Sequence, residues 1–298
     1  KNVDPYNGIS ILGIVCLYDI LNDSGVTSQS DRSLYKNFGA MDRSVMHRPG
    51  FAFNVSMYSD RIRNFESING ENLKGWFTAS GATYLYNDDL NQYLEDYWAT
   101  VDKQRISGTT VLKNSSEENA AFSDAFAGGV EMDGLYGVNA MQYRAPKTKD
   151  GAEGGLEAKK AWFVLDDSIV CLGADIDALT ENAEAETIVD NRKVDDLDSR
   201  LTVDGVQMSG AQTKEFQNPT WAHLQGNEPD TVQTHSTDIG YYFPQGGTLT
   251  AKLETRTDTW RSITNNGKTD VRSKSYTSLA FSHGVKPSEE KYAYAILP

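Results

Sequence analysis

From Arg43 to the C-terminus, the sequence consists of short apolar stretches separated by turn residues. The stretch 51–57 alternates apolar side chains with small or polar ones, and its apolar positions are Phe51, Phe53, Val55 and Met57. A period of two is typical of a half-buried strand. Residues 161–176 read as two strands around the turn Asp166–Asp167, and Asp204–Gly205 is a hairpin signal. This pattern predicts a large antiparallel sheet system.

One segment, 9–21, has a strong helical pattern. Its apolar positions fit a helix with a broad buried face, and they are Ile9, Leu12, Ile14, Leu17, Tyr18 and Leu21. The helix is expected to end before the polar run 27–32. Residue 1 is Lys, and no charged and apolar leader follows it. We therefore expect that a leader has been removed or, because the helix starts almost at once, that a longer parent protein precedes it.

The charge balance limits the partners of this chain. It carries 28 basic and 42 acidic side chains in 298 residues, a formal net charge of −14. Phosphate backbones are bound mainly through Lys and Arg, so a nucleic-acid partner is not expected. The longest apolar run, 9–17, is too short to span a membrane, so no membrane partner is expected either. An anionic substrate would have to be met by a local basic patch.

Cysteine and histidine do not indicate a metal centre. Cys16 and Cys171 are far apart, and we expect two buried thiols, with a disulfide as the alternative. The four histidines have no metal-ligand spacing. A structural calcium or sodium ion could bind an Asp/Asn loop, although no EF-hand spacing is present.

A basic cluster interrupts the acidic chain at residues 41–63. It contains four arginines against two aspartates, and these residues are Arg43, Arg48, Arg61, Arg63, Asp42 and Asp60. The arginine fork matches a carboxylate or sulfate with two hydrogen bonds. The alternative is that these arginines pair with Asp42, Asp60 and Glu66 on a strand surface.

A second cluster, 68–98, mixes aromatic residues with polar ones. The polar residues Asn69 and Asn72 lie close to Trp76, and further aromatic residues follow at Tyr84, Tyr86, Tyr93 and Trp98. Aromatic faces stack on a sugar ring, while amide and carboxylate groups bond its hydroxyls. We therefore expect Asn69, Asn72 and Trp76 to bind a sugar. The alternative is a structural loop whose aromatic residues belong to the core.

The sequence resembles polysaccharide lyase family 8, which contains hyaluronate, chondroitin AC and xanthan lyases. The resemblance begins with residues 41–111, which open MDRSVMHRPGFAFNVSMYS. Later blocks match in the expected order: FAGGVEMDGLYGV, LEAKKAWFVLDDSIVCLGADI, ETIVDNR, DIGYYFPQGGTL and FSHGVKPSEEKYAYAILP. The resemblance implies a mainly β fold, an antiparallel β-supersandwich of the galactose mutarotase-like type, over 37–298. Residues 1–36 would be the C-terminal end of an α/α toroid domain.

The resemblance also implies site residues. Arg43, in the MDR motif, matches a family arginine beside the catalytic Tyr, and Arg48 is expected to bind substrate. A supporting glutamate is matched by Glu157, with Glu131 as the alternative. The catalytic Asn, His and Tyr of the family lie on the toroid and are expected outside this chain. The implied partner is thus an N-terminal α/α toroid domain, in the same parent protein or in a separate chain.

The expected activity is cleavage of a uronic-acid-containing anionic polysaccharide by β-elimination in a secreted, extracellular enzyme. Hyaluronan, chondroitin and xanthan are the expected substrates, and the sequence does not choose among them. The reaction requires no cofactor, but this chain alone is expected to be incomplete. Two alternatives remain open: a carbohydrate-binding module without chemistry, and a structural β-domain whose aromatic stretch seals a joint with a helical domain.

Overall fold

The computed structural model describes residues 10–26, 32–116, 126–146, 154–198, 200–228 and 235–298. The chain divides into two units, Lys1–Arg32 and Ser33–Pro298. The first strand begins at Leu34. Residues 34–36 therefore belong to the β-unit and not to the predicted helical segment 1–36.

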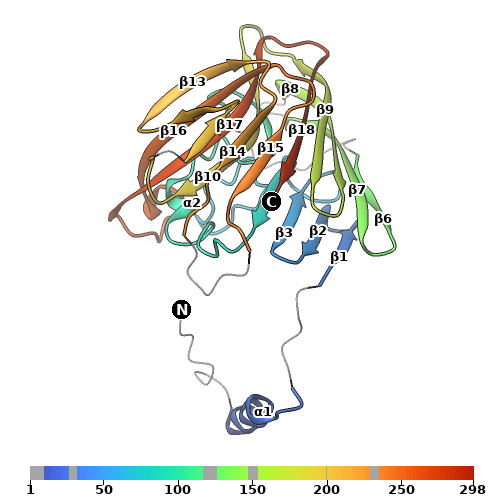
Figure 1. Ribbon diagram of the computed structural model, residues 1–298, viewed down its shortest axis with the longest axis vertical. Helices are drawn as coiled ribbons and strands as arrows, with labels where there is room; N and C mark the ends of the chain where they lie inside the picture. The colour runs from blue at the N-terminus through green and yellow to red at the C-terminus, as the bar shows by residue number, and fades with distance from the viewer. Residues whose placement is uncertain (1–9, 27–31, 117–125, 147–153, 199, 229–234) are drawn as a thin grey trace. The chain divides into compact units, whose positions relative to one another are not determined.

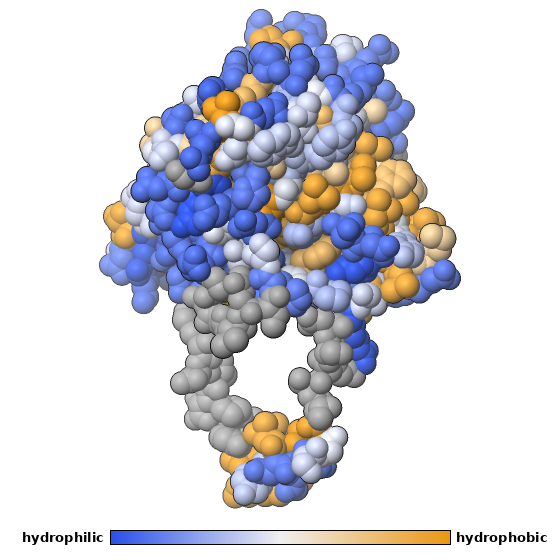
Figure 2. All heavy atoms as spheres, viewed as in Figure 1, coloured by the Kyte–Doolittle hydropathy of each residue, from blue (hydrophilic) through white to orange (hydrophobic). Residues whose placement is uncertain are grey.

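The first unit contains the helix α1, Ile11–Asn22. It begins at Ser10, whose Oγ accepts a hydrogen bond from the Gly13 amide at 3.2 Å, as an N-cap does. The prediction of a helix here is confirmed, but none of its residues is buried. Ile11, Leu12 and Leu21 are exposed, and apolar side chains are visible on its surface in Figure 2. The helix thus has no core of its own.

The second unit consists of antiparallel strands in three sheets (Figure 1). The four-stranded sheet has the order β1-β2-β3-β4, with bounds Leu34–Phe38, Arg43–Arg48, Phe51–Ser56 and Ala82–Tyr86. The five-stranded sheet has the order β13-β16-β17-β10-β5, with bounds Gln212–Gln217, Thr248–Thr259, Val271–Val285, Glu184–Val194 and Thr110–Leu112.

The nine-stranded sheet is the largest and has the order β12-β11-β14-β15-β18-β9-β8-β7-β6. The bounds in that order are Val206–Met208, Leu201–Val203, Trp221–Leu224, Ile239–Tyr242, Glu290–Leu297, Ile169–Ala178, Leu156–Val164, Tyr136–Arg144 and Ala127–Met132. Two short helices, α2 (Tyr97–Thr100) and η1 (Trp260–Ser262), lie between strands. No helix in the described ranges is long and apolar enough to cross a membrane.

The turn predictions are confirmed. Asp204 and Gly205 join β11 to β12, and both have positive φ, +43° and +79°, as a tight hairpin of the mirror-image type requires. Asp166 and Asp167 lie between β8 and β9, which pair antiparallel. The predicted mainly β, antiparallel fold is therefore confirmed.

Two apolar clusters form the core. The larger one joins all three sheets, through side chains such as Phe53, Trp162 and Phe281. The smaller one contains Phe77, Tyr97 and Tyr276, and four partly buried aromatic residues pack against it: Trp76, Tyr84, Tyr93 and Trp98. The aromatic residues of the cluster 68–98 thus belong in large part to the core. Both cysteines are free; Cys171 is buried as predicted, whereas Cys16 is exposed, contrary to prediction.

Close packing in the core requires glycine at Gly173 on β9. A Cβ atom built there would lie 2.0 Å from the ring of Tyr292 on the neighbouring strand β18, closer than any real contact. The Tyr292 ring is itself buried, so it has little room to shift.

We expect Gly173→Ala to lower the free energy of unfolding by about 1–3 kcal/mol, because the added methyl group overpacks the core. Gly39→Ala is the matched control, since a Cβ there meets nothing within 4 Å and no positive φ is required. Urea unfolding of both variants measures the difference. Equal stability of the two variants would contradict the packing described here.

A buried histidine, His283, lies within the five-stranded sheet. His283 lies on β17, and its Nε2 is 2.8 Å from the Thr187 Oγ1 on β10. Burial first, and the nearby Lys160 cation second, lower the pKa of His283 from 6.5 to about 4. The folded protein thus holds this imidazole neutral in mild acid.

We expect His283 to destabilise the fold as the pH falls. The unfolded chain takes up this proton near pH 6.5, and the folded chain takes it up only near pH 4. The contribution of His283 to the free energy of unfolding is therefore fully present above pH 6.5 and is lost as the pH falls from 6.5 to 4. The loss approaches about 3 kcal/mol. Urea unfolding of the wild type and His283→Gln at about pH 7 and about pH 4.5 measures it. A wild type that loses no more stability than the variant would contradict the assignment.

Candidate functional site

The candidate site is a cavity of about 480 Å³ beside the four-stranded sheet. Segments far apart in the sequence meet there, since β2, the 72–78 segment, β4, α2 and η1 all contribute. The lining residues are Arg43, Asn72, Lys74, Gly75, Thr78, Tyr84, Trp98, Lys103, Ile106, Trp260, Ile263 and Thr264. Arg43 also borders a second cavity of about 460 Å³, formed with residues 62–68. Arg43 thus lies at the boundary of both.

Arg43, the first residue of β2, is held on one side only. Its Nη1 donates to the backbone oxygens of Met41 and Asp42, each at 3.1 Å, and of Met57. Within the described ranges, no protein acceptor meets its Nε or Nη2 and no carboxylate pairs with it. Burial lowers the pKa of Arg43, while Tyr84 and Asp42 oppose the shift. The remaining N–H groups form an arginine fork available to a planar anion.

Of the arginines in the basic cluster, Arg61 follows the alternative prediction, because it pairs with aspartates. Its guanidinium forms an ion pair with the buried carboxylate of Asp42 and lies 3.9 Å from Asp60. The four arginines of the basic cluster therefore do not act alike.

Arg48 is buried and bonded to backbone oxygens, an arrangement that does not support its predicted role in binding substrate. Its side chain is 7% exposed and donates to the backbone oxygens of Leu135 (2.7 Å), Leu165 (3.0 Å) and Asp166 (3.0 Å). These three bonds attach the guanidinium to the turns after β6 and β8, and two more go to the backbone oxygens of Leu34 and His47. It lies outside the lining of the Arg43 cavity.

The two candidate glutamates lie elsewhere on the β-unit. Glu157 on β8 forms an ion pair with Arg144 at 2.8 Å and lines a separate cavity of about 370 Å³. Glu131 on β6 pairs with Lys36 at 2.9 Å. The structure brings neither one into the Arg43 cavity, so a catalytic role for Glu157 beside Arg43 has no geometric support in this chain.

The residues predicted to bind a sugar are separated by the fold. Asn72 lines the cavity, is exposed, and donates from Nδ2 to the Glu66 oxygen at 2.7 Å. Asn69 lies in a turn with φ +54°, and Trp76 packs against the smaller core cluster. Both are outside the cavity lining. Only Asn72 of the three lies beside Arg43.

Aromatic side chains form one wall of the cavity. Tyr84 and Trp98 pack together with ring centroids 6.3 Å apart. Trp260 adds a third ring, and its Nε1 donates to Asp96 Oδ1 at 2.7 Å. Sequence reasoning missed Trp260, because it follows a polar stretch at the end of β16, more than 160 residues from Trp98. Its only signal was a tryptophan just after a strand, at a turn.

The lining is cationic. It holds Arg43, Lys74 and Lys103 and no carboxylate, in a chain whose net charge is −14. Burial raises the pKa of Tyr84 well above its ordinary value, and the attraction of Arg43 offsets only part of this shift. Tyr84 therefore stays protonated and serves as a hydrogen-bond donor, here to the Thr78 oxygen at 3.2 Å.

Strand β10 positions the aromatic wall. Every residue of β10 after Glu184 is buried. Arg192 donates to the Leu85 oxygen at 2.9 Å, and Lys193 donates to the oxygens of Asn91 (2.6 Å) and Leu94 (2.9 Å). These bonds attach the segment between Tyr84 and Trp98 to β10 at Leu85, Asn91 and Leu94.

The same strand continues the attachment further along the segment. Asp190 accepts hydrogen bonds from Ser107 at 2.8 Å and from Tyr241 at 2.6 Å. Glu186 pairs with Arg105 at 2.9 Å. Lys103, which lines the cavity, lies just before these anchored residues.

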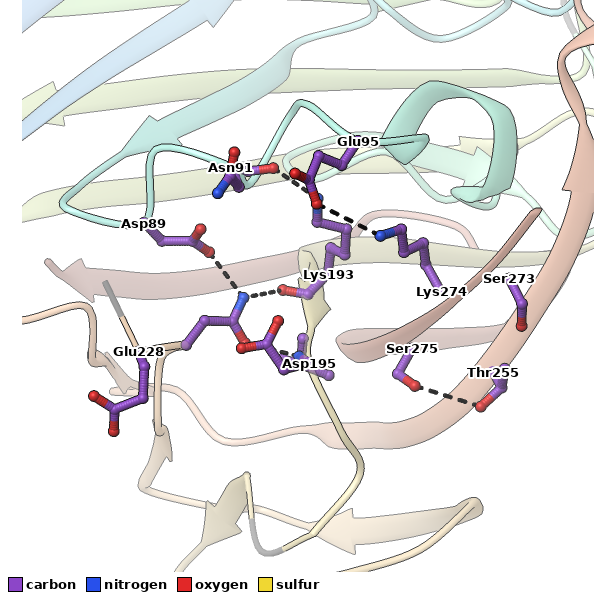
Figure 3. Close-up of a pocket in the computed structure, with 12 residues that line it drawn as sticks. Asp89, Asn91, Glu95, Lys193, Asp195, Glu228, Thr255, Ser273, Lys274 and Ser275 are labelled. Carbon is purple, nitrogen blue, oxygen red and sulfur yellow. Dashed lines mark hydrogen bonds and ion pairs between the residues drawn. The ribbon is translucent and has the colours of Figure 1, made fainter. Parts of the chain in front are cut away.

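A polar cavity of about 340 Å³ lies at the end of β10 (Figure 3). Its charged groups largely satisfy one another. Lys274 lies 3.7 Å from Glu95, and Asp89 accepts from Asn227 at 3.0 Å. Lys193 points to the backbone of the 91–94 segment. This lining supports the 91–94 segment, and both of its lysines, Lys193 and Lys274, have hydrogen-bond or ion-pair partners. Among the described residues, no group of three His, Cys, Asp or Glu side chains could hold a metal ion.

Comparisons with known proteins agree on the chain's relatives. Residues 33–298 match the family model "Polysaccharide lyase family 8, super-sandwich domain". A xanthan lyase of Bacillus sp. (strain GL1) is 42% identical over 98% of this chain and 31% of that protein. A hyaluronate lyase of Thermasporomyces composti is 34% identical over 98% of this chain and 37% of that protein. The chain spans about a third of the length of these relatives.

Solved structures of similar lyases superpose on this chain. The Paenibacillus xanthan lyase superposes with a TM-score of 0.87 at 40% identity, over 98% of this chain and 27% of that one. The Streptomyces coelicolor A3 chondroitin AC lyase in complex with chondroitin sulphate gives a TM-score of 0.76 at 30% identity, over 97% of this chain and 36% of that one. Both likenesses extend over nearly the whole chain.

The hydrogen bond from Trp260 to Asp96 provides a test of the aromatic wall. Asp96 has φ +72°, which Asn tolerates and Ala does not. We expect Asp96→Ala to cost about 1–3 kcal/mol of unfolding free energy, because it strains the backbone and leaves the indole N–H unpaired. Asp96→Asn keeps an acceptor and should cost less than about 1 kcal/mol. Urea unfolding measures both, and an Asn variant as unstable as the Ala variant would contradict this role.

Proposed function

The chain belongs to polysaccharide lyase family 8, and from this premise we propose that its Arg43 cavity forms one wall of a lyase site for a uronic-acid-containing anionic polysaccharide. The observation that carries the proposal is the cavity's charge. It combines three cations, no lining carboxylate, an arginine with free N–H groups and an aromatic wall. Such a lining is typical of a binding site for an anionic sugar and is not typical of a protein core.

The chemistry explains why an arginine is needed. β-Elimination removes the proton at C5 of the uronate, next to a carboxylate that is already negative. Arg43 would bind that carboxylate through its free Nε and Nη2 and stabilise the charge that develops as the proton leaves. Because a guanidinium remains charged at working pH, this stabilisation is permanent. The electron pair of the broken C5–H bond forms the new double bond. The glycosidic oxygen leaves at the same time and takes up a proton.

The proton acceptor would come from a partner of this chain. Tyr84 is the tyrosine in the lining, and its raised pKa makes it a poor base. No histidine lines the cavity among the described residues. The proposed partner is a helical N-terminal domain that carries the base, and a tyrosine placed near Arg43 would have its pKa lowered by that cation. The apolar, unburied helix α1 supports such a partner.

The proposed place of action is outside the cell, where large anionic polysaccharides occur. Hyaluronan, chondroitin and xanthan are the candidate polymers, since the relatives are named for them. A module that binds these polymers without cleaving them is the second candidate, because this chain's own lining supplies cations and rings but no base.

Arg43→Ala tests the proposal. We expect turnover to fall about 10²- to 10³-fold with a smaller change in KM, because the lost contact strengthens in the transition state. Absorbance of the unsaturated product measures turnover of a protein in which a helical domain precedes residue 1. The 298-residue chain alone should bind the polymers without cleaving them.

Two controls separate the outcomes. Arg200→Ala removes an arginine that pairs with Asp196 outside this cavity, and it should leave turnover unchanged. Unchanged turnover in Arg43→Ala would remove Arg43 from the reaction. Saturable binding without product, even when the helical domain is present, would favour the binding module.

A further inference from the structure

The three cations of the Arg43 cavity differ in what already binds them. Arg43 is fixed through Nη1 by three backbone oxygens. Lys103 is 10% exposed, donates to the Ala99 oxygen and lies 3.4 Å from Asp258 Oδ2. Lys74 is partly exposed, and the described residues offer it neither a hydrogen-bond acceptor nor an ion-pair partner.

A free lysine beside a second lysine is unfavourable unless an anion joins them. The repulsion between Lys74 and Lys103 helps to lower the pKa of Lys103, after the larger effect of burial. The carboxylate of Asp258 is shared among Lys103, the Thr259 amide and the Ser262 hydroxyl, and it attracts Lys74 only at a distance, without an ion pair. The cavity therefore keeps positive charge beyond what Arg43 provides.

We propose that Lys74 is a specificity-determining residue that binds a second anionic group of the polysaccharide, distinct from the uronate carboxylate bound by Arg43. This inference rests on the proposed function of the same cavity. The second group is a sulfate ester or a carboxylate-bearing ketal on the sugar next to the uronate. Asn72 and Thr78 lie on the same segment and supply neutral partners for hydroxyls.

The inference ranks the candidate polymers by their charge. Hyaluronan carries one anionic group per repeat and leaves Lys74 unused. Chondroitin sulfate adds a sulfate, and pyruvylated xanthan adds a carboxylate on the terminal sugar. A polymer with the second group should therefore bind and react better than the same polymer without it.

The test compares polymers that differ only in the second group. One arm uses chondroitin 4-sulfate or 6-sulfate against desulfated chondroitin, and the other uses xanthan against depyruvylated xanthan. The protein is this chain with a preceding helical domain, and kcat/KM is measured for each polymer. Kd values of the 298-residue chain for the same polymers provide a readout that needs no catalysis.

Lys74→Gln should reduce the preference for the polymer with the second group about five- to tenfold in kcat/KM and in Kd. Lys74→Arg keeps the charge and should retain most of the preference. Lys214→Gln removes the same charge from edge strand β13, outside this cavity, and should leave the preference unchanged. Salt should weaken the preference of the wild type and have little effect on that of Lys74→Gln.

A preference that Lys74→Gln leaves unchanged in both arms, with stability intact by urea unfolding, overturns the inference. A change in the sulfate arm alone assigns Lys74 to sulfate, and a change in the xanthan arm alone assigns it to the ketal carboxylate. If none of the polymers is bound or cleaved by the wild type, the proposed function fails as well. The two failures are thus distinguishable.

Discussion

The arrangement of the β-unit depends on strand β10, whose polar side chains are enclosed in the protein. A buried polar group without a partner is costly, so each of these side chains requires a bond from a surrounding segment. Those bonds come largely from residues 85–107, through the oxygens of Leu85, Asn91 and Leu94 and the side chain of Ser107. A segment with little regular secondary structure is thereby anchored to β10. The rings that it carries acquire fixed positions.

The cavity has a cationic lining although the whole chain is strongly acidic. Two nearby carboxylates already have partners: Asp42 pairs with Arg61, and Asp258 is shared among Lys103, the Thr259 amide and Ser262. The lining is left with Arg43, Lys74 and Lys103. An acidic surface repels polyanions in general, so a small positive cavity concentrates the attraction at one place. Specificity for an anionic sugar then follows from position more than from total charge.

Much of the fold was predictable from local pattern, because alternation and turn residues act over a few positions. The Asp204–Gly205 hairpin and the helix near the N-terminus are examples. Arg43 and Arg48 could not be separated in this way, since they belong to one motif. Arg48 is structural because the turns containing Leu135, Leu165 and Asp166 surround it, and those turns are distant in the sequence. Trp260 joins the site for a similar reason, through the pairing of long strands.

The hydrogen bond that anchors Trp260 has a thermodynamic consequence for any ligand. An indole ring held by Asp96 has already lost its rotational freedom when the protein folds. A sugar that stacks on it incurs no further loss of side-chain entropy, so a larger part of the contact enthalpy appears as affinity. The conformational cost of recognition is met during folding, and each binding event begins from a surface that is already ordered.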